Sequence, residues 1–273
     1  MTRLRCSEWA RAEEIDPIGT AGSFAGFVLV EWPLPWPRDI SEIPELQPLI
    51  RDAARAGHRV QAVVPDGDTR RTVRYRRPDS EWFGGFELVG EEGERQCDVL
   101  LCTHGRRDVC CGATGTTLAL ELADEPGAFR LWRTSHTGGH RFAPTGILLP
   151  EGTAWAYLDA EAVHRITSRR GPLADLLPRY RGSAGLGPPA VQALEREAFA
   201  EIGWDWLEWR RRGRLDPGGV VHIDAISPTG EAMTWTARAT LGRAVAVPVC
   251  GRPLEEAAKT EVEITIASVV RRG

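Results

Sequence analysis

Apolar and polar residues follow each other with changing periods along the chain, and each period predicts a type of element. Apolar runs of strand length cover 23–32 and 58–65. Between them, apolar residues recur at helical spacing after Ser41, a candidate N-cap, and stop at Gly57. The first third of the chain, 1–95, is therefore predicted to be an α/β N-terminal segment.

A second α/β unit is predicted at 96–170. Its expected elements are a buried strand at 97–102, a helix at 112–124, a strand running into a glycine-bearing loop at 129–140, an antiparallel pair at 146–150 and 154–159, and a helix at 160–169. This order of strand, helix, strand, strand, strand and helix is compatible with a thioredoxin-like layer of sheet and helices.

The tail, 171–273, has a different pattern. Residues 188–212 are expected to form one amphipathic helix, and three or four strands with one wet face follow it. Tryptophans 204, 206 and 209 of that helix allow two interpretations, an aromatic binding box or core packing. We favour core packing, because other apolar residues of the helix complete a stripe. The tail is therefore predicted to be an α+β extension.

Composition and charge limit the classes of function. The 273 residues are 42% hydrophobic, which is enough for a substantial core. A net charge of -4 is too small to favour nucleic acid or an anionic membrane as a partner. No apolar run approaches the ~20 residues of a membrane span, and the N-terminus is charged where a signal peptide is apolar. We expect a cytoplasmic protein, in which clustered cysteines serve a metal or redox chemistry.

The candidate chemistry lies between residues 102 and 140. Cys102 and Cys111 are separated by eight residues, and His136 and His140 flank Thr-Gly-Gly further along. Thiolate and neutral imidazole are ligands for zinc, copper or an iron-sulfur centre, and the glycines let a loop turn tightly enough to aim both rings at one ion. The remaining cysteines include Cys97 and Cys250, which we interpret as small buried apolar residues.

Two motifs carry a resemblance to a known family. The stretch CTHGRRDVCCG at 102–112, followed by SHTGGHRFAPTGILLP at 135–150, resembles the sucrase/ferredoxin-like family of thioredoxin-like 2Fe-2S ferredoxins. The segment 6–37 also resembles the opening of that family. The resemblance implies a 2Fe-2S cluster with four ligands, which are Cys102, Cys111, His136 and His140. Cys111 is favoured over Cys110 because it directly precedes Gly112, as in the family pattern, but the choice between the two stays open.

The resemblance implies an electron carrier without a catalytic substrate, which exchanges electrons with an unidentified redox partner protein. Imidazoles in place of two thiolates lower the negative charge of a cluster, raise its potential and allow proton coupling. The sequence gives no support to the sucrase activity in the family's name, since no carboxylate pair is identifiable as a glycosidase site.

Two alternatives use the same residues. A structural or regulatory zinc protein would hold its ion with the same two cysteines and two histidines. A thiol redox enzyme would use Cys110 or Cys111, although the absence of C-x-x-C argues against disulfide exchange.

Other residues of the first motif have supporting interpretations. His104 is expected to be a loop or supporting residue and not a ligand. The segment Arg106, Arg107 and Asp108 has two interpretations. In the functional one, these residues donate hydrogen bonds to the cluster or guide a redox partner. In the structural one, Asp108 and an arginine hold the loop together.

Overall fold

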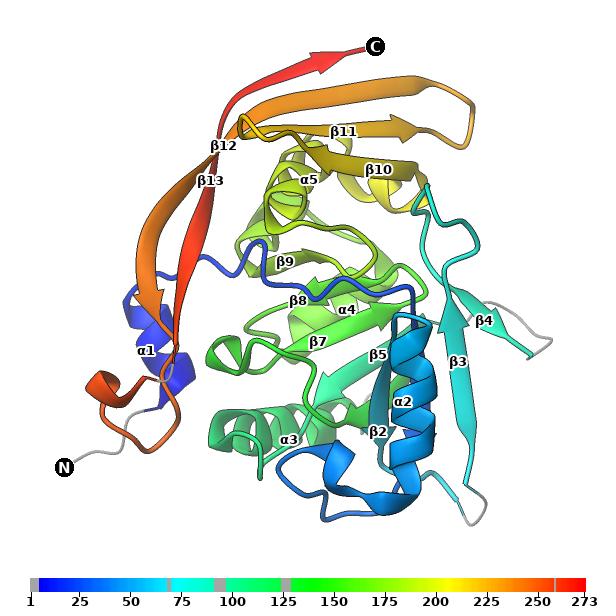
Figure 1. The fold of residues 1–273 in the computed structure, drawn as a ribbon, viewed down its shortest axis with the longest axis vertical. Helices are drawn as coiled ribbons and strands as arrows, with labels where there is room; N and C mark the ends of the chain where they lie inside the picture. Colours follow the sequence, from blue (N-terminus) through cyan, green and yellow to red (C-terminus); the bar gives the residue numbers. More distant parts are fainter. Residues whose placement is uncertain (1–4, 68–69, 91–96, 124–128, 258) are drawn as a thin grey trace.

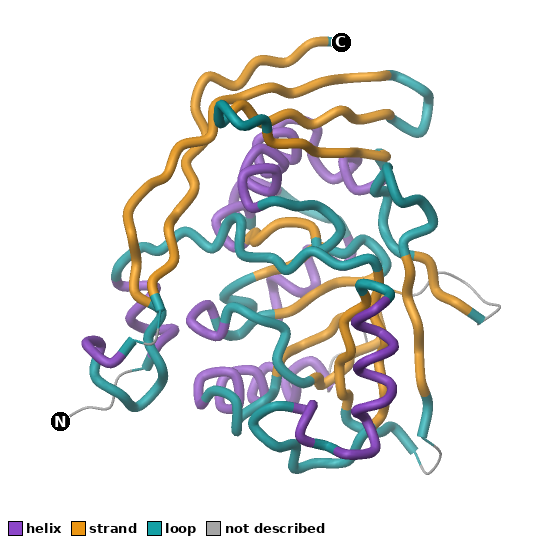
Figure 2. Tube along the Cα trace, viewed as in Figure 1, coloured by secondary structure: helices purple, strands orange, loops and turns teal. Residues whose placement is uncertain are grey.

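One large sheet forms the centre of the molecule. The computed structural model describes residues 5–67, 70–90, 97–123, 129–257 and 259–273. Within these residues the sheet has nine strands (Figures 1 and 2). Their order across the sheet is β4 (Glu87–Val89), β3 (Thr72–Arg76), β1 (Gly26–Glu31), β2 (His58–Val63), β6 (Phe129–Thr134), β5 (Cys97–Cys102), β7 (Gly146–Leu149), β8 (Thr153–Trp155) and β9 (Tyr180–Ser183).

The sheet consists of two halves with the same strand order. In the first half, β1 and β2 are parallel and joined through α2 (Gln47–Arg55), and β3 and β4 follow as antiparallel neighbours on the β1 side. In the second half, β5 and β6 are parallel and joined through α3 (Val109–Ala123), and β7 and β8 follow on the β5 side. The halves meet where the ends of β2 and β6 pair at Val63 and Thr134.

The second half has the element order predicted for 96–170, because α4 (Ala160–Ser168) follows β8. The predicted α/β class is confirmed. The division at 95 and 170 stays a prediction, since the strands of this one sheet come from all three predicted segments.

Short 3-10 helices connect several of these elements. They are η1 (Ile40–Glu42), η2 (Pro44–Leu46), η3 (His140–Phe142), η4 (Leu173–Asp175), η5 (Leu177–Arg179), η6 (Gly203–Glu208) and η7 (Leu254–Glu256). The single helix predicted after Ser41 is divided into η1, η2 and α2, and α2 begins only after Pro44. Ser41 lies within η1, whose cap is Asp39, so the predicted N-cap is wrong. Gly57 has a positive φ directly after α2, as expected for a residue that ends a helix.

The predicted helix at 188–212 is wrong in its second half. Helix α5 (Pro189–Ile202) ends at Gly203, whose φ is +77°, and after η6 the chain continues as strand β10 (Arg210–Leu215). The extended chain brings the buried Arg211 guanidinium to the buried Glu195 carboxylate of α5, at 3.1 Å. Core packing of the tryptophans is confirmed for Trp206 and Trp209, which are buried and pack on Trp235.

The tail forms a second, antiparallel sheet that reaches across the molecule. Its strands lie in the order β10, β11 (Val220–Ile226), β12 (Ala232–Ala246) and β13 (Thr260–Arg272). The β12 and β13 pair extends from α5 to the first helix, α1 (Cys6–Ala12), as the orange and red ribbons of Figure 1 show. There Val245 packs with Ala10 and Phe142. The turn between β12 and β13 therefore lies beside the N-terminal helix. Within the described residues, no helix is long and apolar enough to cross a membrane.

Candidate metal centre

The two predicted cysteine ligands come from adjacent elements of the second half. Cys102 is the last residue of β5, Cys111 lies in the first turn of α3, and both are fully buried. Helix α3 reaches this position because it carries glycine where it crosses the end of β5. A Cβ on Gly115 would lie 2.0 Å from the Cys102 carbonyl oxygen. The close approach of helix and strand brings the two thiols together.

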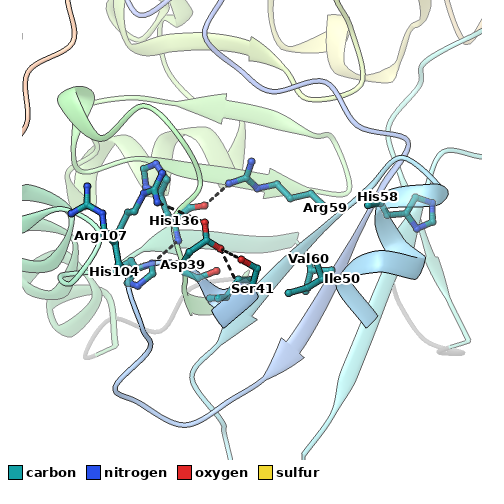
Figure 3. Close-up of a pocket in the computed structure, with 13 residues that line it drawn as sticks. Asp39, Ser41, Ile50, His58, Arg59, Val60, His104, Arg107 and His136 are labelled. Atoms are coloured by element: carbon teal, nitrogen blue, oxygen red, sulfur yellow. Dashed lines mark hydrogen bonds and ion pairs between the residues drawn. The ribbon is translucent and has the colours of Figure 1, made fainter. Parts of the chain in front are cut away.

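His136 follows β6 and joins the two thiols. Its Nδ1 lies 3.9 Å from Cys102 Sγ, and ligand atoms of Cys102, Cys111 and His136 all lie within 4.8 Å of one another. The first half of the sheet holds the backbone of His136 in place. Arg59 of β2 donates a hydrogen bond to the His136 carbonyl oxygen at 2.5 Å, as the dashed line in Figure 3 shows.

His104 supports His136 and is not part of this group. Its Nε2 is 2.8 Å from the Pro37 carbonyl oxygen, and its Nδ1 is 3.3 Å from the His136 amide nitrogen. These partners fix a neutral ring with the proton on Nε2, because the carbonyl accepts and the amide donates. Burial lowers the pKa of His104, which favours the same neutral form. Both ring nitrogens are occupied, so His104 acts as the supporting residue that the sequence predicts.

His140 lies at the edge of the group and not within it. Its ring centroid is 6.1 Å from that of His136, and its Nδ1 is 3.2 Å from Asp108 Oδ2 and 3.5 Å from Cys6 Sγ. Because Nδ1 is engaged, Nε2 is the nitrogen left for a metal. The structure thus gathers three of the four predicted ligands and holds the fourth, through Asp108, beside them.

Asp108 pins the cysteine loop. Its Oδ1 accepts a hydrogen bond from the Cys110 amide at 2.9 Å, and its Oδ2 faces His140. Burial raises the pKa of Asp108, but the hydrogen bond and charge of His140 outweigh burial and leave it below the ordinary value. Of the two interpretations of this segment, pinning therefore applies to Asp108. Arg107 lies 3.8 Å from Asp39, and Arg106 is exposed.

The histidine loop turns at two glycines, as the sequence predicts. Gly138 and Gly139 have φ of +91° and +68°, a region that L side chains rarely adopt. The buried Arg181 holds this turn by donating to the carbonyl oxygens of Gly138, at 3.2 Å, and Thr20, at 2.6 Å. Burial lowers the pKa of Arg181 to about 10.

The comparisons with known proteins fit this geometry. A family model described as sucrase/ferredoxin-like matches residues 45–182, half of the chain, and includes all four predicted ligands. The chain belongs to the sucrase/ferredoxin-like family. No curated protein and no solved structure matches it. The N-terminal resemblance at 6–37 lies outside the residues matched to the sucrase/ferredoxin-like model.

A second group of thiols lies against the family motif. Cys110 Sγ is 3.0 Å from Cys250 Sγ, which is 3.2 Å from Cys6 Sγ, and with Asp108 their ligand atoms all lie within 4.8 Å of one another. Sequence reasoning missed this group, since it interpreted Cys250 as apolar packing and did not use Cys6. Successive helical residues point about 100° apart, so the neighbours Cys110 and Cys111 serve different groups.

Each thiol group concentrates negative charge on one sulfur. A hydrogen bond from Cys111 outweighs burial and, with His136, holds the pKa of Cys102 well below its ordinary value. Hydrogen bonds from Cys250 and Cys6 likewise hold the pKa of Cys110 well below its ordinary value. The bond that Cys250 donates to Cys110 raises the pKa of Cys250 to about 11. Both groups thus contain a sulfur in the form that binds metals.

The histidine side of the centre faces two pockets. A pocket of about 250 Å³ is lined by Arg59, His104, Arg107 and His136, among others (Figure 3). A second pocket, of about 520 Å³, is lined by His136 and His140. The His140 side chain is 21% exposed, whereas Cys102 and Cys111 are 0% exposed. Solvent and other molecules therefore reach this centre from its imidazole side.

Proposed function

We propose that this protein is an electron carrier whose 2Fe-2S cluster is held by Cys102, Cys111, His136 and His140. The observation that carries the proposal is the meeting of two buried thiols with His136 inside the region matched to the sucrase/ferredoxin-like family. A 2Fe-2S cluster needs four terminal ligands, and thiolates and imidazoles are both accepted. The donor types fit, and His140 would supply the fourth ligand through Nε2, since its Nδ1 faces Asp108.

A bound 2Fe-2S cluster supplies one-electron redox chemistry. The protein sets the conditions for it through its own residues. Buried Cys102 and Cys111 exclude water from the thiolate side. Asp108 accepts a hydrogen bond from His140 Nδ1, which fixes the ring orientation and increases the basicity of the other nitrogen.

The exposure of the imidazole side supports a route for electrons and protons. Both pockets open there, and Arg38, Arg59 and Arg107 line the smaller one. A redox partner protein in the cytoplasm would approach on this side, and an imidazole that loses a proton would release it there. No nucleic acid or membrane has a role in this proposal.

Absorption and electron paramagnetic resonance spectra, with iron, sulfide and zinc analysis, test the proposal on protein purified without oxygen. The expected result is a red-brown protein with two irons and two sulfides at this site, as a 2Fe-2S centre requires. A matched control is Cys97→Ser, which changes a half-buried thiol outside both groups and should keep the spectrum.

A second candidate is a zinc site built from the same residues. It is favoured by the short mutual distances of Cys102, Cys111 and His136, all within 4.8 Å, which suit one ion. A colourless protein that loses zinc on Cys102→Ser would support this candidate and contradict the electron carrier.

Proton coupling gives a further test of the two histidines. The midpoint potential should fall with rising pH by up to about 59 mV per unit once a ligand imidazole titrates. His136→Cys or His140→Cys should lower the potential and flatten this dependence, because a thiolate adds negative charge and has no such proton. A cluster-loaded protein with a constant potential across the alkaline range would refute histidine ligation.

A further inference from the structure

The second thiol group joins three distant parts of the chain. Cys6 begins α1, Cys110 lies in the first turn of α3, and Cys250 lies in the turn between β12 and β13. Asp108 completes the group from the loop before α3. We propose that Cys6, Cys110, Cys250 and Asp108 form a second metal site that binds one zinc ion.

The distances suit a single tetrahedral ion. A Zn-S bond of about 2.3 Å places two sulfur ligands of a tetrahedral ion about 3.8 Å apart. Two of the three sulfur pairs lie at 3.0 and 3.2 Å, and the third is within 4.8 Å. Asp108 Oδ1 is 3.5 Å from Cys250 Sγ and 3.6 Å from Cys6 Sγ. The sulfurs need to separate by less than about 1 Å to admit the ion.

The donor set is also suited to zinc by its chemistry. Three thiolates and one carboxylate form a closed set of four, and the sulfur-rich composition favours zinc over magnesium or calcium. Cys6, Cys110 and Asp108 are buried, and Cys250 is half-buried.

A disulfide explains this group less well. A disulfide would join two of the sulfurs and would not account for the third thiol or the carboxylate. A metal ion would bind all three sulfurs and the carboxylate. All six cysteines are free thiols in the structure. A zinc ion would also hold α1 and the β12 to β13 turn against the loop that carries Cys111.

The proposed zinc site and the proposed cluster use different ligands, although Asp108 also faces His140. Cys6 and Cys250 lie outside residues 45–182, which match the family model. The zinc site therefore combines two ligands from the family motif, Cys110 and Asp108, with two from outside the matched residues.

Zinc analysis and X-ray absorption at the zinc edge, on the protein of 273 residues purified without oxygen, test the proposal. We expect one zinc per chain with three sulfur neighbours and one oxygen or nitrogen neighbour. Protein isolated without zinc is titrated with zinc sulfate under reducing conditions and should bind one equivalent in the same environment. Cys6→Ser and Cys250→Ser should lose this zinc and keep the iron and the visible spectrum, whereas Cys97→Ser should keep both metals.

Several results would overturn the zinc site. One is a zinc environment of two sulfurs and two nitrogens, and another is zinc that persists in both Cys6→Ser and Cys250→Ser. A disulfide among the three cysteines of the purified protein would also contradict the site, as would failure of the wild-type protein to bind zinc in the titration. The wild-type zinc edge decides the matter if the variants do not fold. Iron and zinc are measured separately. The zinc result can therefore be interpreted even if the protein proves to contain no iron-sulfur cluster.

Discussion

The two halves of the large sheet share a strand order but end their first strands differently. In the first half, β1 ends at Glu31, whose carboxylate is 1% exposed and is bonded by Arg71 Nε at 3.0 Å and Nη2 at 2.8 Å. In the second half, β5 ends at Cys102, whose sulfur faces Cys111 and His136. The same scaffold therefore carries a closed ion pair at one strand end and a metal-binding group at the other, which shows that chemistry depends on the residues placed on a fold.

The helices of the two halves also differ. Helix α3 brings Gly115 against the backbone of Cys102, whereas most residues of α2 are exposed or half-buried and only Ala53 is buried. The first half takes part indirectly, since Pro37 holds His104 and Arg59 holds His136. One half thus supplies the candidate ligands, and the other orients them.

The largest effect is expected from the adjacent cysteines of the second half. Cys111→Ser should abolish the visible spectrum and the iron content, because it removes a proposed ligand. Cys110→Ser should keep both, because its sulfur belongs to the other thiol group. Iron analysis with absorption spectroscopy checks the pair, and the reverse pattern would assign Cys110 to the cluster.

The second-largest effect, on the free energy of unfolding, is expected where α3 crosses β5. Gly115→Ala places a Cβ 2.0 Å from the Cys102 carbonyl oxygen, which should cost about 3 kcal/mol. The better helix propensity of alanine returns only about 1 kcal/mol, so the free energy of unfolding falls by about 2 kcal/mol. Urea unfolding measures it. Gly218→Ala is the control, since its Cβ meets nothing within 4 Å, and an equal effect of both would refute the contact.

Glu31→Gln tests the closed strand end of the first half. Burial alone would raise the pKa of Glu31. The hydrogen bonds and the charge of Arg71 lower it by more, so the folded pKa is below the ordinary value of about 4.3. The carboxylate stabilises the fold above that value, and this contribution disappears as pH falls through the folded pKa. We expect the substitution to cost about 1–2 kcal/mol at pH 7 and progressively less below about pH 4. A cost that stays constant with pH would contradict the ion pair.

The smallest effect is expected from the first half acting on the second. Arg59→Gln removes a positive charge beside the His136 carbonyl and should lower the midpoint potential without loss of iron, because a cation favours the reduced, more negative centre. Arg59→Lys keeps the charge and should change the potential less. Protein-film voltammetry compares the two variants, and equal shifts in both would show that charge is not the cause.

Local elements were predictable wherever a short pattern determined them. The strand at 97–102, the antiparallel pair that follows and the stop at Gly57 are all set by neighbours in sequence. The end of α5 was missed although Gly203 marked it, because the apolar stripe continues through Trp206 into a different conformation. Strand β12 continues through Gly242 and Arg243, because a register shift between Leu241 and Ala244 accommodates these residues without ending the pairing with β13.

The candidate site was predictable only in part for the same reason. Cys102 and Cys111 stand in one compact motif, and their meeting with His136 follows from two neighbouring strands. Cys6 and Cys250 have no motif in common. The path of the β12 to β13 hairpin brings Cys250 to Cys110, and the contact of α1 with η3 places Cys6 beside them. The role of Asp108 in holding His140 is likewise a property of the folded loop.

The long sequence separation within the thiol group sets an order of events during synthesis. The residues from Cys102 to His140 have all left the ribosome while the tail is still being made. Cys6 and Cys250, which are 244 positions apart, meet only after residue 250 has been released. A polypeptide terminated before Cys250 keeps every ligand of the family motif but never unites these three sulfurs. Their union therefore requires that synthesis has passed residue 250.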